Sequence, residues 1–194
     1  MAGVTMFASA DELAIQLQQS VDAEVAEQLL TQATQIVRDW TGQTISRVTG
    51  DVFQDYSDGS DIFMLPQIPV TAVSAVSVGG VSLGSAEWAF STRGALYRVL
   101  LTGSTVALWK GYWERNIPVR VTYDHGYTAI PAAVKSIVLE LAGQLYTNPV
   151  GSIQSESVAG YSVTYAVSTA ISAGRMGLTS DMQERLKSYR LRDL

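Results

Sequence analysis

Residues 130–149 constrain the fold more than any other part of the chain, because they carry its strongest helical period. Apolar residues three or four positions apart predict one buried helix face: Val134, Ile137, Val138, Leu141, Ala142, Leu145 and Tyr146. Pro131 suits the first helical position, where its missing N–H would have no partner, and Asn148-Pro149 ends the element. The polar residues lie off this face, so we predict a helix whose role is packing.

Two further helices are predicted near the start of the chain. Ser9 and Glu12 have the spacing of a capping box, which begins a short first helix. Ser20 or Asp22 can cap a second helix, and Gly42 is its expected left-handed end residue. The predicted inner face of this second helix consists of Val25, Ala26, Leu29, Ala33, Val37 and Trp40. We expect the two helices to form an antiparallel pair.

After about residue 43 the spacing of apolar residues changes from the helical period to a period of two residues, which is typical of strands. Short apolar runs separated by Gly, Ser and Asn predict an antiparallel sheet or small barrel. Residues 44–53 alternate loosely, and further strands are expected at residues 62–65, 70–83, 88–91, 96–101 and 119–123, with a hairpin that turns at Gly79-Gly80. The predicted fold class is therefore α+β. A small helical bundle (residues 1–43 and 128–194) carries an inserted antiparallel β domain (residues 44–127) and a long loop before the C-terminal helix.

That long loop covers residues 150–174 and contains one charged residue, Glu156. Such a length without a helical period indicates a segment that is either functional or disordered when alone. Residues 155–165 could alternate as a hairpin, with Tyr161, Val163 and Tyr165 on one face. A last helix begins at Thr179 or Ser180 and places Met182, Leu186 and Tyr189 on one face.

Charge is sparse and unevenly distributed. Charged residues make up 16% of the chain, and the net charge of −5 argues against a dedicated nucleic-acid binder. The first 42 residues hold six acids and one arginine, whereas residues 175–194 hold five basic residues and three acids. This polarity would let the basic end of one subunit face an acidic surface elsewhere. The chain has no cysteine, and no apolar run long enough to span a membrane, so we expect a soluble, cytosolically made protein.

The search for chemistry yields no catalytic, metal or cofactor residue. His125 follows a strand beside Asp124, but neighbours along a strand point to opposite faces, so a structural histidine is favoured over a general base. The acids of residues 55–61 lack the spacing of a calcium loop, and turn chemistry is favoured there. Two alternatives stay open: an enzyme that uses His125 and Asp124, and a β-rich binding module that works through Trp88, Trp109, Tyr112 and Trp113.

The order of several segments resembles the head-tail connector, or adaptor, proteins of long-tailed bacteriophages. The segments, in order, are LPQIPV at residue 65, VTYDHG at 121, IP at 130 with its long helix, YTNP at 146, SESVAGYSVTY at 155, and LT at 178 with Leu186 and Tyr189-Arg190. Each motif is degenerate, and the succession carries the resemblance. It covers most of the chain, from the second predicted helix to the C-terminus.

The resemblance implies a structural virion protein of the neck, without catalysis or cofactors. It implies a ring beneath the capsid portal, matched to a twelve-fold portal, which extends the DNA channel without sequence-specific DNA binding and without membrane contact. The ring would present a platform to the next head-completion or tail protein. The resemblance also implies that the C-terminal helix and tail meet the portal protein and that the loop lines or guards the channel. The portal candidates are Arg185, Tyr189, Arg190 and Arg192, and the channel-loop candidates are Ser155, Glu156, Tyr161 and Tyr165.

The helices can bury their apolar faces within one subunit, whereas the loop and tail have no evident partner in it. We therefore expect the isolated protein to be a monomer or weak oligomer that becomes a ring on the portal. The β insertion is large compared with the smallest members of the family, so the resemblance assigns it no role.

Overall fold

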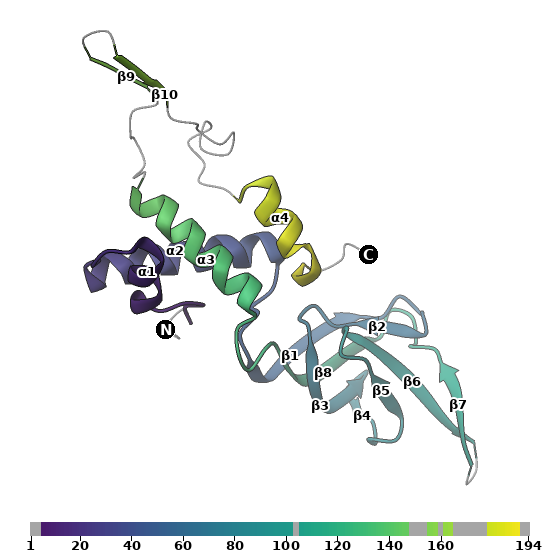
Figure 1. The fold of residues 1–194 in the computed structure, drawn as a ribbon. Helices are drawn as coiled ribbons and strands as arrows, with labels where there is room; N and C mark the ends of the chain where they lie inside the picture. Colours follow the sequence, from purple (N-terminus) through teal and green to yellow (C-terminus); the bar gives the residue numbers. More distant parts are fainter. Residues whose placement is uncertain (1–4, 103–104, 148–154, 159–160, 165–177, 191–194) are drawn as a thin grey trace. The chain divides into compact units, whose positions relative to one another are not determined.

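The structure is a computed structural model that describes residues 5–102, 105–147, 155–158, 161–164 and 178–190. It contains helices and antiparallel sheets, which confirms the predicted α+β class (Figure 1). The chain forms two compact units, a helical unit of Met1–Gly42 with Ile130–Arg190 and a β unit built on Gln43–Ala129. The domain limits predicted from the sequence stay a prediction.

The first two helices begin and end through local capping. Helix α1 (Ala10–Leu17) starts with a complete capping box: the Ser9 N–H donates to Glu12 Oε2 at 2.9 Å, and the Glu12 N–H donates to Ser9 Oγ at 3.3 Å. Helix α2 (Ala23–Thr41) is capped by Asp22, one of the two predicted residues. Gly42 ends it with φ of 68°, as predicted. Polar side chains thus satisfy amides that a helix start leaves without partners.

The buried face of α2 differs from the prediction. The buried residues are Ala26, Leu30, Ala33, Thr34, Val37 and Thr41. The side chain of Val25 is 42% exposed, and those of Leu29 and Trp40 are half-buried. Leu29 and Leu30 are adjacent, so periodicity alone allows either to point inward. The packing of α2 against α3 selects Leu30 and shifts the face by about one residue.

Helix α3 (Ala132–Thr147) is the centre of the helical unit. Six of the seven predicted face residues are fully buried, and Tyr146 is half-buried. The Lys135 N–H donates to the Pro131 carbonyl at 3.0 Å, so Pro131 precedes the helix instead of occupying its first position. Helices α1, α2 and α4 (Ser180–Leu186) all contact α3 (Figure 1). The predicted stop at Asn148-Pro149 lies outside the described residues.

The β unit contains eight strands among the described residues: β1 Val48–Tyr56, β2 Ile62–Met64, β3 Val70–Val78, β4 Val81–Ser82, β5 Trp88–Phe90, β6 Ala95–Thr102, β7 Thr105–Gly111 and β8 Pro118–His125. One sheet has the order β1-β8-β3-β4, and the other has the order β2-β6-β5 with β7 also on β6. All of these strand pairs are antiparallel. The prediction missed β7, whose aromatic C-terminal end was interpreted as a separate cluster.

The core of the β unit lies between its two sheets. It consists of Phe63, Leu65, Val70, Val76, Leu96, Trp113, Val119, Val121 and Tyr123. Strands β3 and β8 supply one side of this core, and β2 and β6 supply the other. The side chain of Phe63 lies between those of Phe53 and Trp113, with ring centroids at 5.9 and 6.0 Å. Aromatic packing therefore joins the two sheets.

Glycines with positive φ fix two close turns of the β unit. Gly79 and Gly80, with φ of 57° and 85°, form the predicted turn that joins β3 to β4, and Val78 pairs with Val81 across it. Gly126, with φ of 86°, lies where the chain leaves β8 against the carbonyl oxygen of Ser46. There a parallel bridge joins Ser46 to Tyr127. A side chain at residue 126 would therefore meet both conformational strain and a steric clash.

The loop before α4 contains the hairpin that the sequence predicted. Strands β9 (Ser155–Val158) and β10 (Tyr161–Thr164) pair antiparallel, with Tyr161 opposite Val158 and Thr164 opposite Ser155. The rest of the predicted loop, including Tyr165, lies outside the described residues. Among the helices that the structure describes, none has both the length and the hydrophobicity required to cross a membrane.

The central helix gives a first stability prediction. Leu141→Ala removes a side chain that is 3% exposed, and we expect a loss of about 2 to 5 kcal/mol in the free energy of unfolding. The exposed Gln28→Ala on α2 is the control and should change it by less than about 0.5 kcal/mol. Chemical denaturation of both variants measures the difference, and similar losses would contradict the packing of α3.

Gly126 gives a second prediction, for which Gly80 is the matched control because both have φ near 85°. At residue 80 no atom lies within 4 Å of an added Cβ. Gly80→Ala should therefore lower the free energy of unfolding by about 1 to 2 kcal/mol through backbone strain alone. In Gly126→Ala the new methyl group also clashes with the Ser46 carbonyl. This variant should therefore lower the free energy of unfolding by at least about 2 kcal/mol more than Gly80→Ala does. Equal losses in denaturant melts would show that the crossing at Ser46 is loosely packed.

Candidate interaction site

Two of the predicted portal residues belong to helical elements: Arg185 lies on α4, and Tyr189 lies on the 3-10 helix that follows it, η1 (Lys187–Tyr189). Helix α4 begins at Thr179, whose hydroxyl accepts from the Met182 N–H at 3.3 Å. Thr179 is therefore the cap, and Ser180 is the first helical residue. Met182 and Leu186 are fully buried, and Tyr189 is half-buried. An apolar stripe thus attaches this short helix to the rest of the unit.

Arg185 holds α4 on α3. Its guanidinium donates to Ser136 Oγ at 2.7 Å and lies 3.4 Å from Glu140 Oε2. A third contact, at 3.6 Å, is to Asp181 Oδ2 one turn away on α4. The side chain is partly exposed but engaged on three sides, so it positions the helix. Sequence analysis did not predict this role.

Arg190 follows η1 and is exposed. Its guanidinium carbon lies 5.4 Å from the centroid of the Trp40 ring, within the range of a cation-π contact. Arg190 therefore keeps its charge at the surface while its side chain packs on α2. Arg192, the fourth portal candidate, lies outside the described residues.

Three of the four channel-loop candidates lie on the hairpin, and the fourth, Tyr165, lies outside the described residues. Ser155 and Glu156 belong to β9, and Tyr161 belongs to β10. The pairing places Glu156 opposite Val163 and Ser155 opposite Thr164. The structure therefore brings three of the four candidates onto one two-stranded element.

The aromatic residues of the alternative binding module differ in burial where the structure describes their side chains, which excludes Trp109. Trp113 is 1% exposed, and its indole N–H donates to the Leu96 carbonyl at 3.3 Å. Trp88 is half-buried and packs against the core of the β unit. Tyr112, by contrast, is 75% exposed. Trp113 therefore belongs to the core of the β unit, whereas Tyr112 points to solvent.

His125 does not pair with Asp124. Its Nε2 lies 3.1 Å from Asp51 Oδ2, and its Nδ1 lies 3.5 Å from Thr44 Oγ1. Asp124 points elsewhere and accepts from the Gly50 N–H at 2.8 Å. The histidine side chain is 1% exposed, so a substrate could not reach it in this conformation. The arrangement favours the structural histidine over the general base.

Polar and aromatic residues surround the buried His125, and its partner Asp51 stays partly exposed. The ring of Tyr123 lies beside that of His125, with centroids 5.1 Å apart. Burial and the nearby negative charge of Asp51 raise the pKa of Tyr123 to about 12, although the Gln67 N–H opposes them. Its phenol therefore stays neutral at ordinary pH, as a packed side chain should.

The acids of residues 55–61 take part in turns. Asp58 Oδ1 accepts from the Ser60 N–H at 2.8 Å, which lowers the pKa of the Asp58 carboxyl group. Gly59 has φ of 91°. Among the described residues, no three His, Cys, Asp or Glu side chains are grouped so that they could hold a metal ion. The turn interpretation therefore fits the geometry of this segment.

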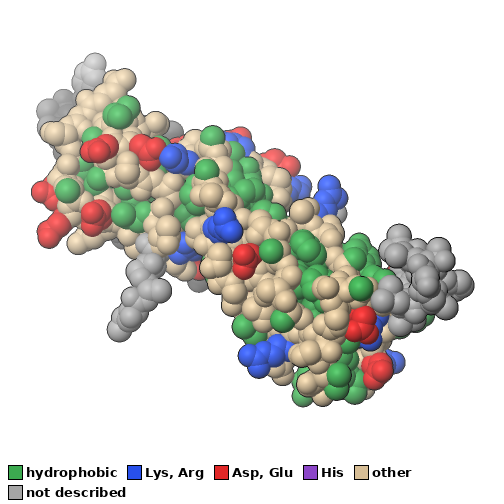
Figure 2. All heavy atoms as spheres, turned by 90° about the horizontal axis from the view of Figure 1, so that it is seen from below, with side chains coloured by type: hydrophobic (Ala, Val, Ile, Leu, Met, Phe, Trp, Pro, Cys, Tyr) green, Lys and Arg blue, Asp and Glu red, His purple; other side chains and the backbone are tan. Residues whose placement is uncertain are grey.

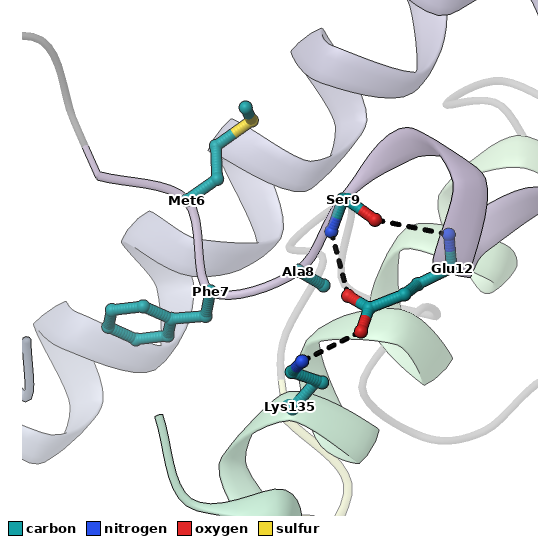
Figure 3. A pocket seen from close by; sticks show the side chains of 6 residues that line it. All are labelled: Met6, Phe7, Ala8, Ser9, Glu12 and Lys135. Carbon is teal, nitrogen blue, oxygen red and sulfur yellow. Dashed lines mark hydrogen bonds and ion pairs between the residues drawn. The ribbon is translucent and has the colours of Figure 1, made fainter. Parts of the chain in front are cut away.

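A shallow hollow on the helical unit has Glu12 and Lys135 on its wall (Figure 3). Glu12 Oε1 accepts from Lys135 Nζ at 2.7 Å, while Oε2 completes the capping box with Ser9. The hydrogen bond from Lys135, with that from the Ser9 N–H, lowers the pKa of Glu12. The two opposite charges attract each other, so this pair attaches α1 to α3.

Comparison with known proteins identifies the family. The model of the head completion protein family matches residues 12–174, which is most of the chain. The chain belongs to the head completion protein family. This confirms the resemblance found in the sequence, and it gives the protein a structural role in completing the phage head. No curated protein sequence matches the chain.

Solved structures share the fold of this head completion protein. A chain in the neck of an empty GTA particle, computed with C6 symmetry, has a TM-score of 0.52 at 15% identity and covers 97% of this chain and 92% of its own. A chain in the virion of the native gene transfer agent (GTA) particle has a TM-score of 0.51 at 17% identity with the same coverage. At these identities the likeness shows a common fold.

The Glu12-Lys135 pair predicts a pH dependence. The pKa of Glu12 lies below its ordinary value of 4.5 in the folded state, so its ionised form stabilises the fold above that pH. This stabilisation is lost as the pH falls through the folded-state pKa. Thermal melts from about pH 7 to about pH 3 should therefore show that Glu12→Gln loses stability at neutral pH and approaches the wild type in acid.

The control for this experiment is Glu27→Gln, because the exposed Glu27 side chain forms no ion pair with any residue that the structure describes. The difference in melting temperature between Glu27→Gln and the wild type should change little over the same pH range. A Glu12→Gln deficit that persisted or grew in acid would contradict the proposed linkage.

Proposed function

We propose that this head completion protein is a head-tail connector in the virion neck. It forms a ring under the portal, extends the DNA channel and provides the docking platform for the next neck or tail protein. The family match over residues 12–174 carries this proposal. The fold shared with chains of a GTA neck and virion supports it.

The proposed portal contact is the surface at the C-terminal end of α4. Arg190 presents its charge there beside the half-buried Tyr189, and both follow a helix that Arg185 fixes in place. Arginine can bind a carboxylate through two parallel hydrogen bonds, and a neighbouring aromatic ring adds apolar contact area. We include Arg192 in this contact because it lies two residues further along the chain.

The proposed channel element is the hairpin, with Ser155, Glu156 and Tyr161, together with Tyr165. Its backbone pairs only within itself among the described residues. DNA would pass without sequence-specific binding, since a chain with a net charge of −5 does not attract phosphates overall. The proposal includes no membrane contact, cofactor or catalytic step: the protein acts through binding surfaces.

The proposal leaves the β unit without an assigned partner. A working surface that uses all four aromatic residues of the alternative module is not supported, because Trp113 belongs to the core. The enzyme hypothesis is weaker still, since His125 is buried and engaged with Asp51.

Portal-bearing heads without tails provide the test. Purified wild-type protein, a monomer or weak oligomer alone, should bind these heads as a ring and reduce DNA leakage. Arg190→Ala should abolish attachment and lower the free energy of unfolding by less than about 1 kcal/mol, because the lost contact with Trp40 is a surface cation-π pair. Attachment should also weaken with rising salt, since exposed charges are screened.

The control is Arg93→Ala, which removes an exposed arginine from the β unit and should bind as the wild type does. If the wild type did not bind portal-bearing heads, the connector function would be wrong. If Arg190→Ala bound normally while the wild type formed rings, only the assigned contact would be wrong.

A further inference from the structure

Strand β1 is one edge of the sheet that also contains β8, β3 and β4. In the sheet order β1-β8-β3-β4, the only neighbour of β1 among the described strands is β8. The strand is nine residues long and contains Val52, Phe53 and Tyr56, all of which favour strands. Val52 is 46% exposed and Tyr56 is 67% exposed. A long edge with exposed apolar side chains is a template for pairing with another chain.

The register shows which amides point away from the sheet. The Ser57 N–H donates to the Ile117 carbonyl at 3.1 Å, directly after the pair Tyr56 and Pro118. In an antiparallel pair, consecutive residues direct their N–H groups to opposite sides. Because the register is regular from Asp51 to Tyr56, the outward amides are those of Val52, Gln54 and Tyr56.

Two of these three outward amides are occupied by carboxylates of the same strand. The Val52 N–H donates to Asp51 Oδ1 at 2.9 Å, and the Tyr56 N–H donates to Asp55 Oδ1 at 2.7 Å. The second oxygen of Asp51 contacts Nε2 of the buried His125 at 3.1 Å, which holds this carboxylate in position. These acids therefore fill the hydrogen-bonding positions that an added strand would need.

We propose that Asp51 and Asp55 close the edge of β1 against strand pairing with a second copy of this chain. An incoming strand would have to displace two charge-assisted hydrogen bonds and then lie beside two negative charges. The device is independent of the proposed connector function. It would leave other surfaces of the protein free to direct assembly while copies accumulate at high local concentration.

The test uses Asp55, because Asp51 also supports His125. Asp55→Ala should lower the dissociation constant for self-association by at least about tenfold, the ratio that corresponds to about 1.4 kcal/mol. Light scattering over a concentration series measures this dissociation constant. Glu114→Ala, which removes the same charge at an exposed site elsewhere in the β unit, should associate as the wild type does. Hydrogen exchange of Asp55→Ala should slow at the Gln54 and Tyr56 amides as concentration rises.

A second substitution shows whether the association uses this edge. Gln54→Pro removes an outward amide that β8 does not use, and proline is tolerated there on an edge strand. The combination of Asp55→Ala with Gln54→Pro should return self-association to the wild-type level, with thermal melts confirming the fold. The proposal would be overturned if Asp55→Ala associated no more than Glu114→Ala, or if its association persisted with proline at residue 54.

Discussion

The buried face of α3 is the constraint on which the helical unit depends. Six of its side chains are fully buried, and α1, α2 and α4 each contact it. Polar residues beside this face attach the flanking helices: Lys135 binds Glu12 of α1, and Glu140 contacts Arg185 of α4. The two short helices, which would be marginal alone, are thus ordered by packing and by ion pairs to the same partner.

The packing of α4 on α3 also fixes the position of the candidate portal surface. Arg190 reaches the surface because Met182 and Leu186 are buried and Arg185 is held by Ser136. A binding residue on a frayed tail would lose more conformational entropy on binding than one that is already positioned. The contact of Arg190 with Trp40 gives part of that positioning before any partner is present.

Several polar and aromatic residues of the β unit stabilise its fold. Trp113 and Phe63 join the sheets, and His125 is engaged with Asp51. Asp51 has two roles, since one oxygen contacts His125 and the other covers an edge amide. Residue types that often mark binding or catalytic sites are used here to complete a small two-sheet core and to protect its edge.

The sequence by itself determined the local elements, because caps and periods are properties of neighbouring residues. Ser9, Asp22 and Gly42 mark helix limits, and Gly79-Gly80 marks a turn, as the structure confirms. Only the tertiary structure decided which side of α2 is buried, since Leu29 and Leu30 are equivalent until α3 packs on one of them. It also decided the contacts of Arg185 with Glu140 and of His125 with Asp51, because such partners lie 45 and 74 residues apart and spacing cannot reveal them.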